Sequence, residues 1–378
     1  MRITRRGLLA GAAASAGACV SEPALGPSGA AASADAIAAK LHADFPTPAL
    51  SLAVARASGI VWAKCHGKAN LELDIEATPQ HAFKLGSVSK IITATAAGRM
   101  AMRGALDLDA PISRWMTDLP EQHRATTLRQ LLTHRGGVRH YRPKDSIESQ
   151  PGGNIDSRVY PTSAAMLAVF INDPLIAEPG TTSTYSTFGY TLASIAMEAA
   201  AGKPFLQLIA DEIATPCALP TLAADDPVSL RPNRAAGYGR AIAYASAFPL
   251  AAGDWVNIRQ VNPAYKWAGG GLLCTPSDLA RFGASHFDPA FTPPALRDIL
   301  FAVQVKGTPN SPPLGLGWRV DADGKGRTRW HHAGNQDGGR SGLVVYPDLA
   351  VAVAISSNVS SIPGDVLTPA SALADVFG

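Results

Sequence analysis

The stretch FKLGSVSK (residues 83–90) decides how the whole chain is interpreted. Gly86 permits a sharp entry from a strand into a helix, so we expect Ser87 in the first turn with Lys90 on the same face, three residues later. The helix N-terminus favours negative charge that develops there. A serine attacks only when a base removes its proton, and a partly neutral Lys90 has the chemistry to do so. The alternative is a helix cap followed by an exposed lysine.

Two later stretches carry residues that suit the same chemistry. In PGTTSTYSTFGYTLASIAMEAAAG (residues 179–202), Tyr185 stands in a loop just before a helix, where its hydroxyl can point into a cleft. The alternative is a tyrosine packed in the core. In RWHHAGNQDGGRSGLVVYP (residues 329–347), His332 comes at the end of an expected edge strand, before a glycine-rich loop. A structural histidine is the alternative at this position. The adjacent histidine pair has no partner set at ligand spacing, so we expect no metal.

In this order, S-x-x-K, Tyr-x-Thr and His-x-Gly resemble the motifs of the serine β-lactamase and penicillin-binding protein superfamily. The resemblance covers roughly residues 36–360 and includes further stretches typical of the class-C-like branch. These stretches are TLRQLLTHRGGVRHY (127–141), YSTFGYTL (185–192), NPAYKWAGGGLLCTPSDLARF (262–282) and GLGWRV (315–320). The segments RHY, YSTFGYTL and YKWAGGG are most similar to the mitochondrial serine β-lactamase-like proteins.

The resemblance implies acyl transfer through an ester of Ser87. Lys90 and Tyr185 would share the proton transfers, and which of them is the base stays open. The backbone N–H groups of Ser87 and Asn335 would form the oxyanion hole. His332 takes the position of a lysine in many relatives and would orient the substrate or the proton network.

Substrate contacts are expected from Thr187, Gly334 and Arg340. Arg340 would supply a cation for an acidic substrate, and a solvated surface arginine is the alternative. Three residues depart from the family pattern: Thr187 replaces an asparagine, Ala333 a threonine or serine, and Gly136 a serine. The departures weaken the case for an efficient β-lactamase, because contacts that hold the antibiotic are missing.

Hydrophobic periodicity predicts a mixed α/β (α+β) fold. ALSLAVAR (49–56) and IVWAKCHG (60–67) form an expected β-hairpin after a helix at residues 35–45. A small-residue helix follows Ser87 as far as Gly104, and residues 161–173 and 189–202 show strong helical periods. Strands return at 314–321, 328–334, 341–347 and 350–358, before a final helix at 366–377. We therefore predict one antiparallel sheet from N- and C-terminal strands, flanked by terminal helices, with a helical insertion of approximately 91–285 in a single domain of residues 35–378.

The N-terminus has the layout of an export signal. Arg5 and Arg6 precede an apolar run from Leu8 to Ala18, which is too short to span a bilayer and resembles a twin-arginine signal. Residues 1–34 are thus expected to be an export signal and leader of a periplasmic or extracellular protein. Cys19 is a candidate lipid anchor, although Ala16 stands where an aliphatic residue is usual. A disordered basic N-terminus is the alternative.

Composition excludes several function classes. The chain of 378 residues is 47% hydrophobic, with mixed charges and a formal net charge of +3, so nucleic acid is not an expected partner. Cys65, Cys217 and Cys274 remain after the expected signal, and an odd number cannot form a complete disulfide framework. No C-x-x-C pair suggests zinc. No cofactor is expected.

The sequence therefore predicts a secreted serine hydrolase that acts on a small peptide or ester carbonyl. One alternative is a β-lactamase that hydrolyses β-lactam antibiotics. Another is a penicillin-recognising binding protein or filament-forming scaffold with little turnover, which the resemblance to mitochondrial relatives implies. A homo-oligomer is a further candidate among its partners.

Overall fold

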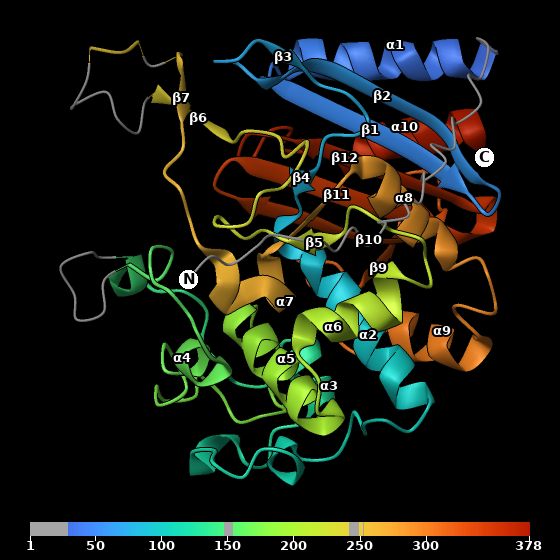
Figure 1. Ribbon diagram of the computed structural model, residues 1–378. Coiled ribbons are helices and arrows are strands. Elements are labelled where there is room, and N and C mark those ends of the chain that lie inside the picture. Colours follow the sequence, from blue (N-terminus) through green and yellow to red (C-terminus); the bar gives the residue numbers. More distant parts are fainter. Residues whose placement is uncertain (1–28, 147–153, 242–248, 252) are drawn as a thin grey trace, which may run out of the picture.

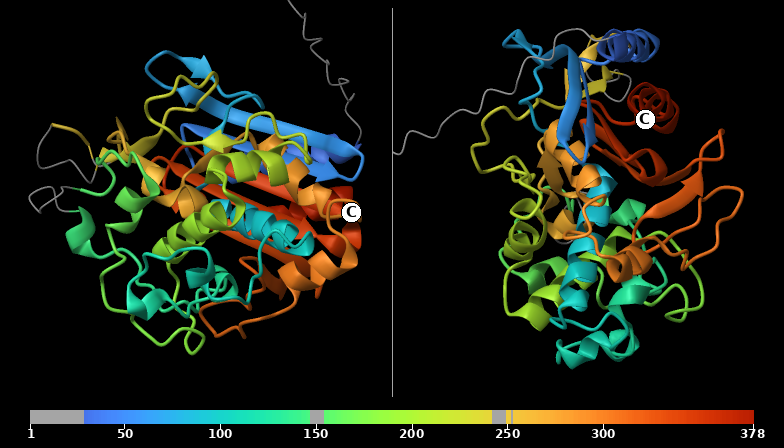
Figure 2. Two further views of the ribbon diagram at one scale, coloured as in Figure 1. Left: turned by 60° about the horizontal axis from the view of Figure 1, so that its bottom comes forward. Right: turned by 90° about the vertical axis from the view of Figure 1, so that its right-hand side faces the viewer.

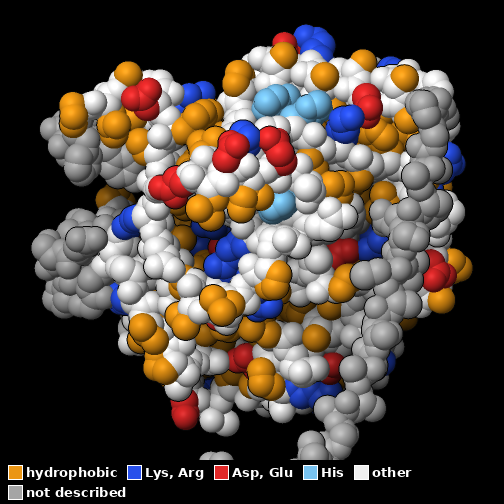
Figure 3. All heavy atoms as spheres, turned by 45° about the horizontal axis from the view of Figure 1, so that its top comes forward, with side chains coloured by type: hydrophobic (Ala, Val, Ile, Leu, Met, Phe, Trp, Pro, Cys, Tyr) orange, Lys and Arg blue, Asp and Glu red, His pale blue; other side chains and the backbone are white. Residues whose placement is uncertain are grey.

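The computed structural model describes residues 29–146, 154–241, 249–251 and 253–378. The predicted twin-arginine signal and the candidate anchor Cys19 lie outside the described residues and stay predictions. None of the helices in the described ranges is both long and apolar enough to cross a membrane. On the face shown in Figure 3, acidic, basic and apolar side chains are interspersed.

A seven-stranded antiparallel sheet joins the two ends of the chain, which confirms the predicted fold class. Its strands, side by side, are β3 (Ile75–Glu76), β2 (Gly59–Asn70), β1 (Ala49–Arg56), β12 (Val351–Ser357), β11 (Gly339–Tyr346), β10 (Thr328–Gln336) and β9 (Arg319–Ala322). The central pair is β1 with β12, in which Leu52 lies opposite Ile355. In Figure 1 the blue N-terminal strands therefore lie directly beside the red C-terminal ones.

Both faces of this sheet are covered, so β1 is buried almost throughout. Its larger side chains, including Leu52 and Val54, share a core with the terminal helices α1 (Gly29–Asp44) and α10 (Leu367–Phe377). Helix α1 begins at Gly29, inside the predicted leader, because the alanine-rich segment favours a helix and Ala34 packs into this core. Figure 2 shows the terminal helices on one side of the sheet and the helical region on the other.

On the other face, small residues allow helices to approach closely. Helix α8 (Pro276–Ser285) packs on β1 and β12, and a Cβ at Gly283 would lie 2.8 Å from the Cβ of Ala352. Helix α2 (Ser89–Met102) is buried along most of its length, which its alanine- and threonine-rich sequence permits. It runs through the centre of the helical region.

The chain between the hairpin and β9 is mostly helices and loops. Its other helices are α3 (Leu128–Leu132), α4 (Ser163–Leu167), α5 (Thr187–Ala201), α6 (Phe205–Ile209), α7 (Trp267–Gly270) and α9 (Pro294–Phe301), with a π-helical turn, η5 (Ala210–Ala214), after α6. Short strands β4 (Phe83–Lys84), β8 (Leu272–Cys274) and β5 (Ala223–Ala224) form a second sheet, and β6 (Tyr238–Arg240) pairs with β7 (Trp255–Asn257). Helix α4 is shorter than the predicted 161–173, because the chain turns so that Phe170 stacks on Phe188 with ring centroids 4.6 Å apart.

Strand β10 and the turn before α2 touch backbone to backbone. The turn is a 3₁₀ helix, η1 (Gly86–Val88). A Cβ at Gly334 of β10 would lie 1.9 Å from the carbonyl oxygen of Leu85, and a Cβ at Gly86 would lie 2.7 Å from the nitrogen of Asn335. Gly86 also has a φ of +50°, which side chains other than glycine rarely adopt. Glycine is therefore required on both sides of the contact.

We predict that Gly334→Ala lowers the free energy of unfolding by about 2 kcal/mol or more, since overpacking against immobile backbone forces strands apart. The matched control is Gly324→Ala, because a Cβ there meets no atom within 4 Å. Denaturant unfolding of both variants measures the difference. Equal stability of the two variants would show that β10 and η1 are not in close contact.

Candidate active site

Ser87 is the middle residue of η1, one turn before Lys90 of α2. The sequence predicted an α-helical first turn, and the structure has a 3₁₀ turn that passes directly into α2 at Ser89. Ser87 is partly exposed, whereas Lys90 is completely buried. The hydroxyl is thus open to a substrate while the ammonium group lies beneath it.

The Ser87 hydroxyl has two predicted partners within hydrogen-bond distance. Tyr185 Oη donates to Ser87 Oγ at 2.6 Å, and Lys90 Nζ donates to the same atom at 3.2 Å. Tyr185 stands two residues before α5, whose N-cap is Ser186. The structure therefore brings together three side chains that the sequence separates by up to 98 positions.

Lys90 Nζ has two further acceptors below the serine. It donates to Thr187 Oγ1 at 3.2 Å and to the carbonyl oxygen of Gly269 in α7. Burial lowers the pKa of Lys90, although the nearby Tyr185 works in the opposite direction. Thr187, predicted to contact substrate, thus lies with its hydroxyl against Lys90 and is itself buried.

Tyr185 is electrostatically coupled to Lys90. Burial alone would raise the pKa of Tyr185, but the charge of Lys90 and the hydrogen bonds that Tyr185 forms with Lys90 and Ser87 outweigh it, so the pKa is lowered. Lys90 Nζ lies 4.7 Å from the centroid of the Tyr185 ring. Because each group shifts the other, the pair loses its proton as a unit.

The predicted oxyanion hole lies at a free strand edge. Strand β9 pairs with β10 only from Thr328 to His331, so the edge of β10 from His332 onward is left without a strand partner. Asn335 is exposed on this edge. The Gly86–Gly334 contact brings the amide nitrogens of Ser87 and Asn335 into the same narrow region beside the serine hydroxyl. Two N–H groups so placed are the donors that an acyl-transfer reaction needs.

His332 is buried beside this cluster, and its ring is neutral. Burial lowers its pKa well below the usual value, and the charges of Arg319 and Lys90 lower it further. Its Nδ1 lies 2.8 Å from the carbonyl oxygen of Ala333 and must donate there, which leaves Nε2 as an acceptor. The neighbouring His331 faces a carboxylate instead, with its Nε2 atom 3.3 Å from Oδ1 of Asp321. Within the described ranges, no three His, Cys, Asp or Glu side chains are grouped to hold a metal ion.

Two arginines lie near the free edge, and the sequence singled out only one of them. Arg340 donates to the carbonyl oxygens of Pro363, Gly364 and Gly334 at 3.1, 2.7 and 3.4 Å. Its guanidinium is therefore already engaged. Arg319, the first residue of β9, has no hydrogen bond or ion pair from its side chain to any described residue. Its charge nevertheless acts on Lys90, Tyr185, His332 and Arg340.

Arg319 belongs to the GLGWRV stretch, but no motif marked it. Its place beside the site depends on the register of β9 against β10, in which it lies opposite His331. Sequence reasoning also assigned no role to His134 and His140, whose rings lie against Tyr185. The only signal for these histidines was their spacing in THRGGVRHY.

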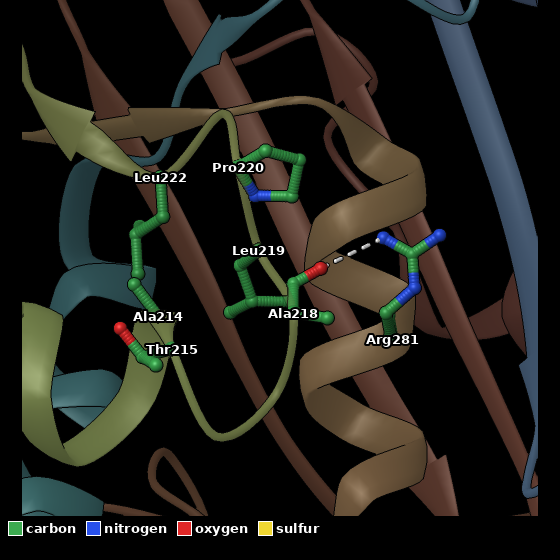
Figure 4. Close-up of a pocket in the computed structure, with 7 residues that line it drawn as sticks. All are labelled: Ala214, Thr215, Ala218, Leu219, Pro220, Leu222 and Arg281. Atoms are coloured by element: carbon green, nitrogen blue, oxygen red, sulfur yellow. Dashed lines mark hydrogen bonds between the residues drawn. The ribbon is translucent and has the colours of Figure 1, made fainter. Parts of the chain in front are cut away.

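A cavity of about 210 Å³ adjoins the end of β10. Its lining consists of Tyr141, Ile155, Asp156, Val261, Tyr265, Lys266, Asn335, Gln336 and Asp337. A wider hollow of about 870 Å³ lies elsewhere, between η5 and α8, and Figure 4 shows Arg281 reaching across to the carbonyl oxygen of Ala218 at 3.3 Å. Ser87, Lys90, Tyr185 and His332 line neither hollow. We place the site beside the smaller cavity because Asn335, the predicted oxyanion-hole residue, is part of its lining.

The fold and this group of side chains together are those of a serine β-lactamase-like hydrolase. The family model described as Beta-lactamase matches residues 34–376, so the chain belongs to the β-lactamase family, as its motifs predicted. The human mitochondrial serine β-lactamase-like protein LACTB is 28% identical over 284 residues, which are 59% of this chain and 50% of that protein. The chain thus spans about half the length of this relative. Esterase EstB of Burkholderia gladioli is 25% identical over 340 residues, which are 80% of this chain and 83% of the esterase.

Solved structures share the fold at lower identity. The D-amino acid amidase from Ochrobactrum anthropi SV3 superposes with a TM-score of 0.76 and 22% identity, over 92% of this chain and 98% of the amidase. A homologue from Pyrococcus abyssi, described as an octameric penicillin-binding protein homologue, superposes with a TM-score of 0.73 and 21% identity, over 91% of this chain and 75% of its own. At this identity the likeness concerns the fold alone.

The coupled Lys90–Tyr185 pair predicts an acid limb in the pH profile of ester hydrolysis. The pKa of each group is lowered, so one proton leaves the pair below pH 10, where an isolated tyrosine or lysine would still hold it. With the deprotonated pair as the expected base, kcat/KM should rise with pH through this apparent pKa and fall as the pair is protonated. Measuring kcat/KM from pH 5 to 10 for native protein and Tyr185→Phe tests this. A profile that is flat over this range, or unchanged by Tyr185→Phe, would contradict the coupling.

Proposed function

We propose that this protein is a serine hydrolase that cleaves a peptide or ester carbonyl through an acyl-enzyme at Ser87. The observation that carries the proposal is that one hydroxyl, Ser87 Oγ, is bonded at once to Tyr185 and Lys90 beside two backbone N–H groups. A nucleophile, a base and an oxyanion site are the three parts that acyl transfer requires.

In the acylation step, the Ser87 hydroxyl proton passes to the Tyr185–Lys90 pair as Oγ attacks the carbonyl carbon. The carbonyl oxygen becomes an oxyanion that accepts from the N–H groups of Ser87 and Asn335. When this intermediate collapses, the bond to the leaving nitrogen or oxygen breaks, and the pair returns the proton to the leaving group. Water then attacks the Ser87 ester with the same pair as base, which releases the acid and restores the serine.

We propose that the acyl group is small and enters the cavity of about 210 Å³ beside Asn335. Each of its three charged lining residues has a partner: Lys266 Nζ lies 3.6 Å from Asp156, and Asp337 lies 3.9 Å from Nε of Arg259 outside the lining. The lining therefore offers no uncompensated charge to a strongly ionic acyl group, and a neutral polar or apolar one fits better.

We propose that the leaving group bears a carboxylate held by Arg319. This arginine is partly buried beside Lys90, Tyr185 and His332, and no described carboxylate neutralises it. A buried cation normally has an anionic partner, so a substrate carboxylate would supply what the chain does not. Arg340, which the sequence favoured for this role, is bonded to three carbonyl oxygens and is less available.

The β-lactamase alternative has less support. Ala333 cannot offer a hydroxyl to a β-lactam carboxylate, and the Thr187 hydroxyl is bonded to Lys90. The scaffold alternative rests on relatives rather than on a feature of this site.

We expect native protein to hydrolyse p-nitrophenyl acetate with turnover and to keep a fluorescent penicillin bound for longer than one ester turnover. Ser87→Ala removes only the attacking oxygen and should abolish both signals, with circular dichroism as the check on folding. Rapid release of hydrolysed penicillin would favour a β-lactamase. Labelling without any ester or amide turnover would favour a binding protein and refute the hydrolase.

For Arg319 we expect selective loss on acidic substrates. A hydrogen bond to a charged group is worth roughly 1.5–3 kcal/mol, so Arg319→Gln should lower kcat/KM about tenfold or more for an N-acetyl-D-alanyl-D-alanine peptide with a free carboxylate. Its C-terminal amide should change about twofold or less. Arg340→Gln is the matched control and should affect both peptides equally. Equal losses on both peptides with Arg319→Gln would exclude the carboxylate role.

A further inference from the structure

The segment that carries Tyr185 is bonded along its length to residues 134–140, which we call the cradle segment. The N–H of Thr184 donates to the carbonyl oxygen of His134 at 2.9 Å. The hydroxyl of Ser186 donates to the carbonyl oxygen of Arg139 at 2.7 Å. Tyr185 therefore stands on a backbone that is fixed on both sides.

Two imidazole rings take part in these bonds. The N–H of Ser186 donates to Nδ1 of His134 at 3.2 Å, and the N–H of Thr187 donates to Nδ1 of His140 at 3.3 Å. These are the two amides that follow Tyr185 and lead into α5. Without the histidines, both N–H groups would lose their acceptor at a buried helix start.

The same two rings contact the tyrosine ring itself. The ring centroid of His134 lies 4.5 Å from that of Tyr185, and the ring of His140 meets it edge-on at 5.4 Å and 84°. Each histidine thus fixes a backbone amide and packs on the side chain between them. The amide bonds fix the backbone that carries Tyr185, and the rings add packing on its side chain.

The acceptor role requires both rings to be unprotonated at Nδ1. Burial lowers the pKa of His134 well below its usual value, and the charges of Lys90 and Arg319 lower it further, together with His140. Burial lowers the pKa of His140 to about 4, with Lys90, Lys266 and Arg139 acting the same way and Asp145 opposing them. Both rings are neutral at pH 7 and can accept from the amides.

The cradle segment is itself held rigidly. Arg139 is buried and donates to Asp145 at 2.7 and 3.1 Å, to Asp173, and to the carbonyl oxygens of His140 and Val169. His134 follows Thr133, the C-cap of helix α3, and has a φ of +59°, in the left-handed region; its ring packs on Tyr185. These charge-assisted hydrogen bonds hold the segment that carries the two histidines in place.

We propose that His134 and His140 are positioning residues that hold the Tyr185 hydroxyl at bonding distance from Ser87, through the amides of Ser186 and Thr187. The inference rests on the proposed function, because only a tyrosine that transfers the proton needs such placement. A displacement of about 1 Å at a catalytic group can lower the rate about a hundredfold. Neither histidine touches the substrate in this role.

The test uses a matched pair of variants at His140, the more exposed of the two. His140→Asn keeps an acceptor near the place of Nδ1 and loses the ring, whereas His140→Phe keeps a ring and loses the acceptor. We measure kcat and KM for p-nitrophenyl acetate in the native and the Tyr185→Phe backgrounds, with thermal unfolding of each variant. If His140→Phe does not fold, the comparison of His140→Asn with native protein in both backgrounds remains.

We expect His140→Phe to lower kcat about tenfold or more with little change in KM, and His140→Asn to stay within about threefold of native. In the Tyr185→Phe background, His140→Phe should change kcat by less than about twofold, because the group that it positions is absent. An undiminished loss in that background, or a loss with His140→Asn as large as with His140→Phe, would overturn the positioning role. If Tyr185→Phe alone leaves kcat unchanged, the tyrosine is not catalytic, and the proposed mechanism fails together with the inference.

Discussion

The contact between the backbone of β10 and the turn η1 is the constraint on which the rest of the site depends. There is no space for a Cβ at Gly334 or at Gly86, so the strand and the turn meet through bare peptide groups. This contact brings the amide of Asn335 to Ser87, the proposed nucleophile, from 248 positions away in the sequence. The β1–β12 pairing, which joins the two chain ends, holds the sheet that presents β10 to the helical region.

The second feature of the site is its uncompensated positive charge. The charge of Lys90 acts on His134, His140 and His332, and that of Arg319 acts on His134 and His332. The nearby carboxylate of Asp321 is paired with Arg329 and His331. Burial and the positive field keep the histidines neutral. Burial lowers the pKa of Lys90, and the charge of Lys90 lowers the pKa of Tyr185 against the effect of burial. The same field favours the oxyanion and a substrate carboxylate. In the proposed mechanism, one charge arrangement would serve proton transfer, transition-state stabilisation and substrate selection.

The sequence predicted those parts of the structure that depend on local pattern. The hairpin, the C-terminal strands and the short spacing from Ser87 to Lys90 are local, and the fold class followed from strands at both ends. The positions of Tyr185 and His332 beside the serine were implied by family motifs rather than by spacing. The role proposed for Arg319 depends on strand register. The hydrogen bonds of Arg340 depend on the path of the chain at residues 363–364, whose carbonyl oxygens accept from it. No local sequence pattern indicates either feature. His134 and His140 act through loop-to-loop bonds, which are invisible in a linear pattern.

The most direct measurement of the central claim is a crystal structure of the protein after reaction with an alkyl fluorophosphonate. The tetrahedral phosphorus stands in for the carbon of the acyl-transfer intermediate, and its non-bridging oxygen stands in for the oxyanion. We expect a covalent bond from phosphorus to Ser87 Oγ, with that oxygen about 2.7–3.1 Å from the amide nitrogens of Ser87 and Asn335. An adduct on another residue would contradict the assignment of Ser87 as the nucleophile. An adduct on Ser87 whose non-bridging oxygen points away from Asn335 would contradict the assignment of the oxyanion hole.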